Sequence, residues 1–308
     1  MRKILLIVCL FLSVVLFING LYVLSDSQMD NKAKYDSHKD YSGEYIQENR
    51  EVNHNNSNAE KEPVNILIIG LDDEGARSDV IMLVNYSPGV GKVNILSIAR
   101  DTRVRVRGEI EKINALYTIG GELLMVNAIQ QMTGLPVKYY VTINFEGFRK
   151  IIDALGGVQV DVPMDMVYND PTQNLYINLK KGRQLLDGEK AEQFVRFRKG
   201  NSPGEGYIDG DIGRNKAQQQ LLKELVSQKL NLRYISKADD VYYLLRKYVK
   251  TNIEMKDVTY YLKDLAKLDY NSVSTFTTPG DSVNINGIWY YICDQKEVRK
   301  LIDEHFYH

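Results

Sequence analysis

Apolar residues follow two patterns along the chain: one long uncharged segment near the N-terminus, and shorter runs over residues 64–308. Residues 4–24 carry no charged side chain and follow the basic residues Arg2 and Lys3. As a helix this segment rises about 31 Å, which is enough to cross a bilayer core of roughly 30 Å. Because the basic flank stays in the cytoplasm, the pattern predicts a single-pass anchor in the cell membrane, with a cytoplasmic tip at 1–3 and the remainder outside. A cleaved signal peptide is the alternative, but no small-x-small cleavage site follows the run.

Residues 25–63 have a different character, because they are polar, acidic and rich in asparagine. Such a composition cannot bury enough apolar surface to offset the entropy of ordering. We therefore expect a flexible extracellular stalk that ends at Pro63, followed by one large domain over residues 64–308.

Within residues 64–308, short apolar runs alternate with stretches of helical periodicity. Strands are expected over 65–70, 80–86, 92–98, 137–143, 158–162, 272–277 and 286–292. Helices are expected over 112–132, 146–155, 189–198, 214–230, 238–249, 256–267 and 294–306. The segment 87–91 predicts a hairpin turn between the second and third strands. Interleaved strands and helices predict an α/β fold, a three-layer α/β/α sandwich around a central mixed sheet.

Composition narrows the function. The net charge of −1 gives no bulk field that would recruit nucleic acid, so no nucleic-acid partner is expected. One of the two cysteines lies in the N-terminal apolar run, which excludes a disulfide framework and fits a Gram-positive bacterium. The four histidines lie in the stalk and at the C-terminus, which argues against zinc and histidine-base chemistry.

Arginines and aspartates gather where the predicted elements begin or end, and such ends can meet in one cleft. The guanidinium fork of arginine matches phosphate oxygens, and aspartates among such arginines can hold a divalent cation that also binds phosphate. The pattern predicts a site for a pyrophosphate and a magnesium ion, outside the membrane. The candidates are Asp72, Arg77, Asp79, Arg100, Arg196, Arg198, Asp211, Arg214 and Gln218.

Simpler roles compete at several of these positions. Turn formation explains aspartates around a short loop, a surface ion pair with Asp101 explains Arg100, and helix capping explains Asp211. Arg196 and Arg198 point the same way only if the chain is extended there, and they diverge if it is helical. Arg214 and Gln218 lie one helical turn apart and can address the same phosphate.

The motifs around these residues resemble, in order, those of the LytR-CpsA-Psr family of anchored cell-wall proteins. The resemblance covers residues 64–225 and is loose beyond them, chiefly at Thr278-Pro279-Gly280. It rests on Asn65–Asp72 with Arg77-Ser78-Asp79, Ser97–Thr102, Lys112–Ala115, Asn144–Phe148, Asp153–Val158, Leu179–Gly182, Leu186–Ala191, Arg196-Phe197-Arg198, Gly210–Arg214 and Gln218-Gln219.

The resemblance implies a magnesium-dependent phosphotransferase that moves teichoic acid or capsular polysaccharide from a polyprenyl-pyrophosphate carrier to a muramic acid hydroxyl of peptidoglycan, through a phosphodiester. It implies magnesium on Asp72 and Asp79, and an apolar pocket between sheet and helices for the polyprenyl chain. It places Arg196 and Arg198 in the pyrophosphate site. We expect Arg77, Arg100, Arg214 and Gln218 to bind pyrophosphate as well, Arg100 and Arg198 also to act in catalysis, and Asp72 or Asp211 to be the base.

Two other functions stay open. One is a regulatory protein that binds polyprenyl phosphate without turning it over, and the other is a polyprenyl-pyrophosphate hydrolase that passes the intermediate to water. Glu74, Ala99 and Ala217 depart from the family pattern, and the first and third remove phosphate donors, which favours a member specialised for one polymer or a weak one.

Overall fold

The computed structural model describes residues 62–307 except 73–74, 76, 174, 203, 209–210, 230–237, 255, 258–259, 262–263, 265–267 and 269. The predicted anchor over 4–24 and nearly all of the predicted stalk therefore lie outside the described residues. No helix within the described ranges is both long enough and apolar enough to cross a membrane.

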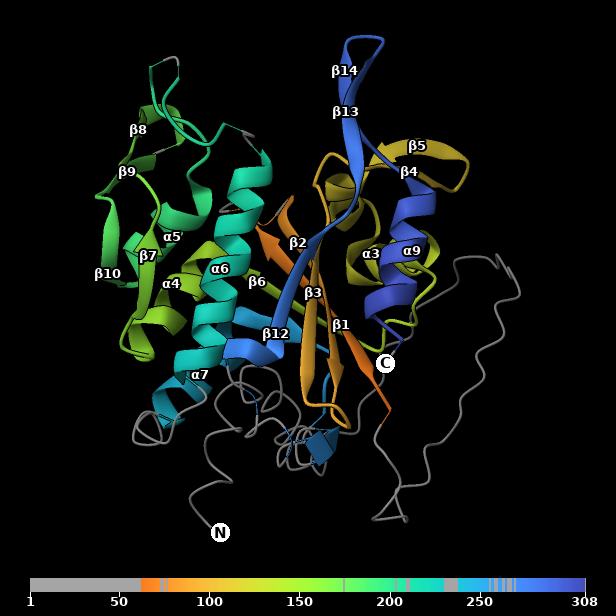
Figure 1. The fold of residues 1–308 in the computed structure, drawn as a ribbon, viewed down its shortest axis with the longest axis horizontal. Helices are drawn as coiled ribbons and strands as arrows, with labels where there is room; N and C mark the ends of the chain where they lie inside the picture. Colours follow the sequence, from red (N-terminus) through yellow and green to blue (C-terminus); the bar gives the residue numbers. More distant parts are fainter. Residues whose placement is uncertain are drawn as a thin grey trace, which may run out of the picture.

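A six-stranded mixed sheet forms the centre of the molecule, in the strand order β11-β6-β1-β2-β3-β12 (Figure 1). Strand β2 runs antiparallel to both β1 and β3, whereas β6 is parallel to β1 and β12 is parallel to β3. This arrangement confirms the predicted central mixed sheet. The strands are β1 (Val64–Leu71), β2 (Ser78–Ser87), β3 (Lys92–Ser97), β6 (Tyr139–Asn144), β11 (Val249–Thr251) and β12 (Val273–Thr277).

Helices cover both faces of this sheet. On one face, Leu67 and Ile69 of β1 pack with α3 (Leu116–Thr133) and α9 (Gln295–His305). On the other, Ile66 and Ile68 face α4 (Phe145–Ala154), α6 (Asp211–Lys229) and α7 (Ala238–Tyr248). Strand side chains alternate between faces, so a strand that is buried on both sides reads as a continuous apolar run.

A smaller lobe beside α4 and α6 has its own apolar cluster. It contains the pair β7 (Val158–Val162) and β10 (Gly182–Leu186), the pair β8 (Met166–Asp170) and β9 (Leu175–Leu179), the short helix η2 (Pro171–Gln173), and α5 (Gly188–Arg196). Gly188 allows α5 to approach α4 closely, because a Cβ at this position would lie 2.3 Å from the carbonyl oxygen of Arg149. The lobe therefore holds α5 against the end of α4.

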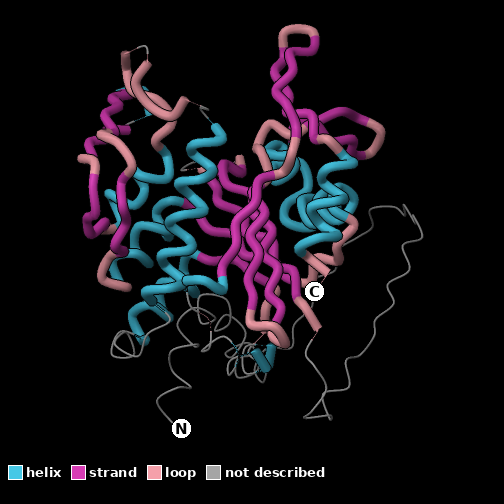
Figure 2. The backbone as a smooth tube through the Cα atoms, in the orientation of Figure 1, coloured by secondary structure: helices cyan, strands magenta, loops and turns pink. Residues whose placement is uncertain are grey.

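Two hairpins on the opposite side correct the predicted elements. The pairs are β4 (Arg103–Val106) with β5 (Glu109–Lys112), and β13 (Gly280–Ile285) with β14 (Ile288–Cys293). The strand predicted over 286–292 was wrong at its start, because Asn286 and Gly287 have positive φ and form the turn. Figure 2 shows the β13–β14 hairpin projecting from the body of the molecule.

The helix predicted over 112–132 is also more broken than expected. It begins as the 3-10 helix η1 (Ile113–Ala115), and α3 is kinked where Gly120 and Gly121 leave helical geometry. A further 3-10 turn, η4 (Tyr270–Ser272), precedes β12. Most of the helix predicted over 256–267 lies outside the described residues.

Candidate active site

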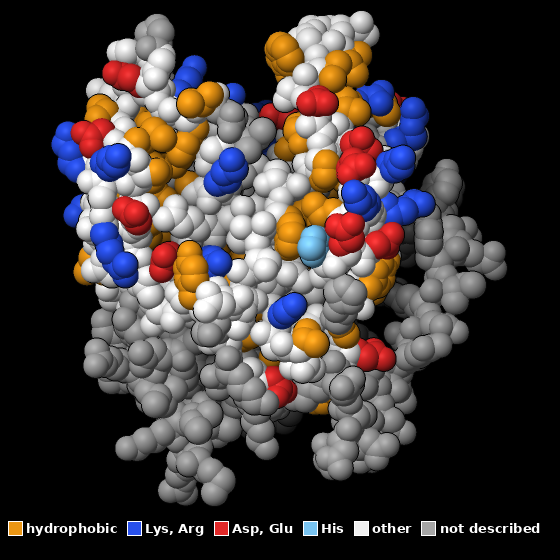
Figure 3. All heavy atoms as spheres, viewed as in Figure 1, with side chains coloured by type: hydrophobic (Ala, Val, Ile, Leu, Met, Phe, Trp, Pro, Cys, Tyr) orange, Lys and Arg blue, Asp and Glu red, His pale blue; other side chains and the backbone are white. Residues whose placement is uncertain are grey.

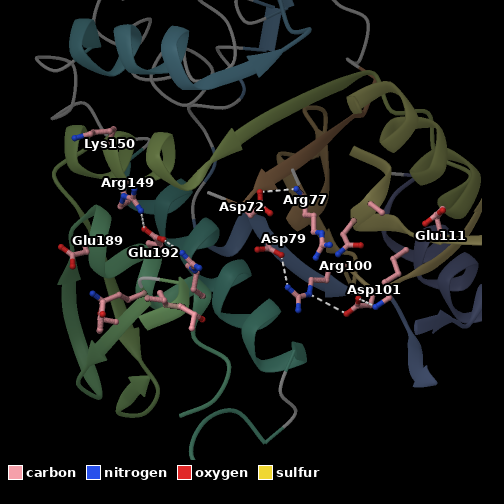
Figure 4. A pocket seen from close by; sticks show the side chains of 18 of the residues that line it. Asp72, Arg77, Asp79, Arg100, Asp101, Glu111, Arg149, Lys150, Glu189 and Glu192 are labelled. Atoms are coloured by element: carbon pink, nitrogen blue, oxygen red, sulfur yellow. Dashed lines mark hydrogen bonds and ion pairs between the residues drawn. The ribbon is translucent and has the colours of Figure 1, made fainter. Parts of the chain in front are cut away.

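A polar cleft of about 1580 Å³ opens at the carboxyl end of β1. Its walls come from the loop after β1, the start of β2, the loop after β3, η1, α4, α5, β9 and β14. The central meander explains this convergence, because the end of β1, the start of β2 and the end of β3 meet at one edge of the sheet. Five of the predicted site residues line the cleft, namely Asp72, Arg77, Asp79, Arg100 and Arg196. Figure 4 labels the first four.

The loop from Asp72 to Arg77 combines turn formation with a place in the cleft. The backbone N–H of Asp72 donates to the carbonyl oxygen of Arg77 at 3.0 Å, and the N–H of Arg77 donates to Asp72 Oδ1 at 3.3 Å. These bonds close the loop and fix the Asp72 side chain at the edge of the cleft. The turn-forming role that competed with a site role is therefore present, and it positions the carboxylate.

Arg100 lies between two carboxylates. Its Nη1 donates to Asp79 Oδ1 at 3.0 Å, and its Nε lies 3.8 Å from Asp101 Oδ2. The Arg100 and Asp79 side chains are each 33% exposed, so both reach the solvent of the cleft. Asp101 forms its shorter contact with Lys112, whose Nζ lies 2.8 Å from Oδ1. These contacts hold the Arg100 side chain in the cleft beyond the carboxyl end of β3 and not on an open surface.

A second charged group lies on the wall formed by α4 and α5. Glu192 is only 8% exposed and accepts hydrogen bonds from Arg149 through Oε2 and from Arg196 through Oε1, the latter at 2.7 Å. The Arg196 guanidinium lies 4.9 Å from the centre of the Phe145 ring. All three charged residues line the cleft, and Figure 4 shows Glu192 beside Arg149.

Arg149 and Glu192 line the cleft but are not among the residues predicted from the sequence. The spacing of Glu192 and Arg196, four residues apart on a predicted helix, was a signal for their pairing. No local pattern indicated Arg149, because its contact depends on the packing of α4 against α5.

We expect Glu192→Gln to lower both stability and activity. The amide cannot accept charge-assisted bonds from two guanidinium groups, so the free energy of unfolding should fall by about 1–3 kcal/mol. A displaced Arg196 should lower the glycan transfer that the family resemblance implies by about tenfold. Urea unfolding and initial rates measure the two effects. Glu189→Gln, an exposed position on the same helix, should change the unfolding free energy by less than about 0.5 kcal/mol, and an equal effect of both variants would contradict this account.

Other predicted residues lie elsewhere. Helix α5 ends at Arg196, and the next residue, Phe197, is extended and 1% exposed. Arg198 is therefore exposed and, like the half-buried Arg214 in the first turn of α6, it is not among the described residues that line the cleft. Asp211 is the first residue of α6, but its side chain lies outside the described part. The roles predicted for these residues stay predictions.

Gln218 lines the apolar cavity described below and is not among the described residues that line the polar cleft. It is 8% exposed, and its amide donates to the carbonyl oxygen of Val195 at 3.2 Å. This bond joins α6 to α5. Among the positions that depart from the family pattern, Ala217 is buried in the apolar cluster of the lobe, and Glu74 lies outside the described residues.

An apolar cavity of about 290 Å³ lies between the sheet and helices α4 and α6. Its strand wall includes Ile66, Ile68 and Ile143, and its helix wall includes Leu222 and Leu225. The cavity occupies the place where the family resemblance implies a polyprenyl pocket.

The cavity and the cleft meet at the carboxyl end of β1. Leu71 lines the cavity, and the next residue, Asp72, lines the cleft. Phe145 likewise lines the cavity, and its ring packs against the guanidinium of Arg196, which lines the cleft. A molecule with a charged head and an apolar tail can therefore occupy both spaces.

The tyrosines in the cavity wall do not bring charge into it. Burial raises the pKa of Tyr261 to about 12, and burial also raises the pKa of Tyr86. The two rings pack edge to face at 5.9 Å. Both phenols stay neutral at physiological pH, so the cavity suits a hydrocarbon chain.

Within the described residues, no three His, Cys, Asp or Glu side chains lie close enough to hold a metal ion alone. Magnesium usually binds through one or two carboxylates together with substrate phosphates and water. Asp72 and Asp79 both line the cleft, which fits an ion shared with a bound diphosphate.

Comparisons with known proteins identify the family of this chain. The sequence model of the LytR_cpsA_psr family matches residues 23–306. The polyisoprenyl-teichoic acid–peptidoglycan teichoic acid transferase TagU of Oceanobacillus iheyensis is 32% identical over 255 residues, covering 80% of this chain and 76% of TagU.

Solved structures are also similar. Bacillus subtilis TagV matches with a TM-score of 0.67 and 30% identity over 80% of this chain and 98% of TagV. TagT bound to LI-WTA matches with a TM-score of 0.65 and 28% identity over 79% of this chain and 89% of TagT. The match to the family model spans nearly the whole described domain, and the chain therefore belongs to the LytR_cpsA_psr family.

Proposed function

We propose that this protein transfers an anionic glycopolymer, such as teichoic acid, from a polyprenyl-diphosphate carrier to peptidoglycan. The observation that carries this proposal is the junction of an arginine-lined cleft with an apolar cavity at the end of β1. A lipid diphosphate has the matching chemistry, with charge at one end and hydrocarbon at the other. The relatives' names, which state teichoic acid and peptidoglycan, support the same donor and acceptor.

In the proposed reaction, a peptidoglycan hydroxyl attacks the phosphorus that carries the glycan. A new P–O bond forms, the P–O bond to the bridging oxygen breaks, and polyprenyl phosphate leaves with the bond electrons. Arg100 and Arg196 stabilise the charge that develops on the phosphate oxygens. The hydroxyl proton passes to a carboxylate, for which Asp72 and Asp211 are the candidates.

We propose Asp72 and Asp79 as the residues that would hold magnesium. A bound ion would neutralise phosphate charge during transfer. The ion pair of Asp79 with Arg100 keeps this carboxylate at the cleft.

Removal of divalent ions tests the proposed magnesium site. We expect chelation to lower glycan transfer by at least about tenfold and added magnesium to restore it, because several kcal/mol of charge stabilisation depend on the ion. Asp79→Asn should raise the magnesium concentration needed for half-maximal transfer. Initial rates over a magnesium series measure both effects, and full activity in excess chelator would refute the metal requirement.

The proposed location follows from the sequence and the substrate. The uncharged segment over 4–24 with its basic flank supports a single-pass anchor with the catalytic domain outside the cell. Such an anchor would keep the cleft close to a carrier lipid in the same membrane.

The function is tested with the full-length protein in detergent, a defined polyprenyl-diphosphate glycan, magnesium and peptidoglycan. Mass spectrometry should detect glycan phosphate on peptidoglycan together with released polyprenyl monophosphate. Phosphorylated glycan formed without any acceptor would instead indicate a hydrolase. Bound lipid that is never turned over, even with peptidoglycan present, would indicate a regulatory protein.

A further inference from the structure

The β13–β14 hairpin stands beside the cleft on a fixed base. At this base, the N–H of Tyr291 donates to the carbonyl oxygen of Asp101 at 2.9 Å, and its hydroxyl donates to the carbonyl oxygen of Thr278 at 2.7 Å. Beyond the base, the hairpin projects from the body of the molecule (Figures 1 and 2). The hairpin is therefore a two-stranded element that is held at its base and lies outside the apolar core.

The two faces of this hairpin differ in what they meet. The register pairs Val283 with Tyr290 and Ile285 with Ile288, so these four side chains share one face. Ile288 and Tyr290 line the polar cleft, which identifies this face as the one turned toward it. Trp289 pairs with Asn284 on the other face.

The cleft-facing side is apolar and open. Ile288 is 49% exposed and Val283 is 40% exposed, and Figure 3 shows hydrophobic side chains on the projecting hairpin. Exposed apolar groups that border a polar cavity are typical of a binding surface rather than of a core. The ligand of such a surface must present an apolar face of its own.

The hairpin itself supplies no cation, because residues 280–294 contain no lysine or arginine. The opposite wall carries the cations Arg149, Lys150 and Arg196 among the carboxylates Asp153, Glu189 and Glu192. An anionic polymer pairs with guanidinium and ammonium groups, whereas sugar rings without phosphate, each with an apolar face of C–H groups, suit the apolar side chains of the hairpin.

A short chain of contacts links the hairpin with the proposed reaction centre. The Tyr290 ring centre lies 5.9 Å from Lys112 Nζ, and Lys112 pairs with Asp101 at 2.8 Å. Asp101 in turn lies 3.8 Å from Arg100. Tyr290 and Arg100 therefore line the same side of the cleft, with Lys112 and Asp101 between them.

We propose, on the premise of the function given above, that the cleft-facing side of the β13–β14 hairpin binds sugar rings of the peptidoglycan acceptor. Val283, Ile285, Ile288 and Tyr290 form this surface, which we call the acceptor face. It holds the glycan strand while arginines elsewhere in the cleft contact the anionic donor. Binding at the acceptor face presents a sugar hydroxyl to the phosphorus.

Tyr290→Ala in the full-length protein tests this assignment. We expect the peptidoglycan concentration for half-maximal transfer to rise by about tenfold or more, because an aromatic anchor is lost from the acceptor site. Tyr290→Phe, which keeps the ring, should stay within about twofold of the wild type. The affinity for polyprenyl diphosphate should not change in any of these variants.

Trp289→Ala is the matched control, because it removes a larger and more exposed aromatic side chain from the same strand. It should leave the acceptor dependence within about twofold of the wild type. An equal effect of Trp289→Ala would overturn the acceptor face and indicate contact of the whole hairpin with the bilayer. Weaker donor binding in Tyr290→Ala would overturn it in favour of the donor polymer.

A binding assay separates this inference from the proposed function. Wild-type protein should sediment with purified peptidoglycan, and Ile288→Ser together with Tyr290→Ala should reduce the bound fraction while the thermal midpoint stays within a few degrees. If the wild type sediments but transfers nothing, the proposed function fails and the acceptor face stands. If transfer occurs but these substitutions change neither sedimentation nor acceptor dependence, the acceptor face is wrong.

Discussion

Arg100→Ala should lower the rate of glycan transfer by about 10²–10³-fold, the loss typical when one preorganised donor is removed from a developing oxyanion. Arg100 follows the carboxyl end of β3 and lines the cleft, and its Nη1 donates to Asp79 Oδ1 at 3.0 Å. Its loss removes a phosphate donor and releases one proposed magnesium ligand at the same time. Initial rates with saturating donor and acceptor measure the effect.

Two further variants separate charge from geometry at this position. Arg100→Lys should recover only part of the lost rate, because an ammonium group cannot bind two phosphate oxygens as a planar fork does. Arg105→Ala should have little effect, because this exposed arginine on β4 donates to the carbonyl oxygen of Gly108 and does not line the cleft. An Arg100→Ala variant that is as active as Arg105→Ala would show that Arg100 is not part of the site.

Leu222→Trp should weaken lipid binding without unfolding the protein. Leu222 is half-buried on α6 and lines the apolar cavity, so a larger side chain would occupy space meant for the hydrocarbon tail. Filling a cavity usually preserves or raises stability. We expect the affinity for polyprenyl phosphate to fall by at least about tenfold while the thermal midpoint is unchanged or higher.

The control for cavity filling is the same substitution at an exposed leucine. Leu123 is 70% exposed on α3, beyond the other face of the sheet, so Leu123→Trp should leave lipid binding intact. Lipid affinity measured by fluorescence titration and thermal midpoints measured by circular dichroism test both variants. Normal lipid binding by a stable Leu222→Trp protein would show that the tail lies elsewhere.

The sequence was sufficient to predict the centre of the fold and part of the site. Strands that pack on both faces, such as β1 and β3, read as largely apolar runs because most of their residues are buried. A meander of three antiparallel strands then brings Asp72, Asp79 and Arg100 to the same edge. Their convergence depends on strand order alone, which short connections indicate.

The rest depends on tertiary packing. Arg149 meets Glu192 only because Gly188 allows α5 to press against α4. The direction of the Arg198 side chain depends on the residue at which α5 ends, and local sequence specifies helix ends poorly. The β13–β14 hairpin, by contrast, carried a readable signal in Asn286-Gly287, which the sequence analysis placed inside a strand.

The central claim is that one lipid diphosphate occupies both the cleft and the cavity, with its head at Arg100 and its tail between the sheet and α6. The most direct measurement is a crystal structure of the protein with a non-hydrolysable polyprenyl diphosphate. This account predicts phosphate oxygens in contact with the Arg100 guanidinium and hydrocarbon packed against Leu222 and Ile68. A diphosphate bound away from Arg100, or a tail outside the apolar cavity, would contradict it.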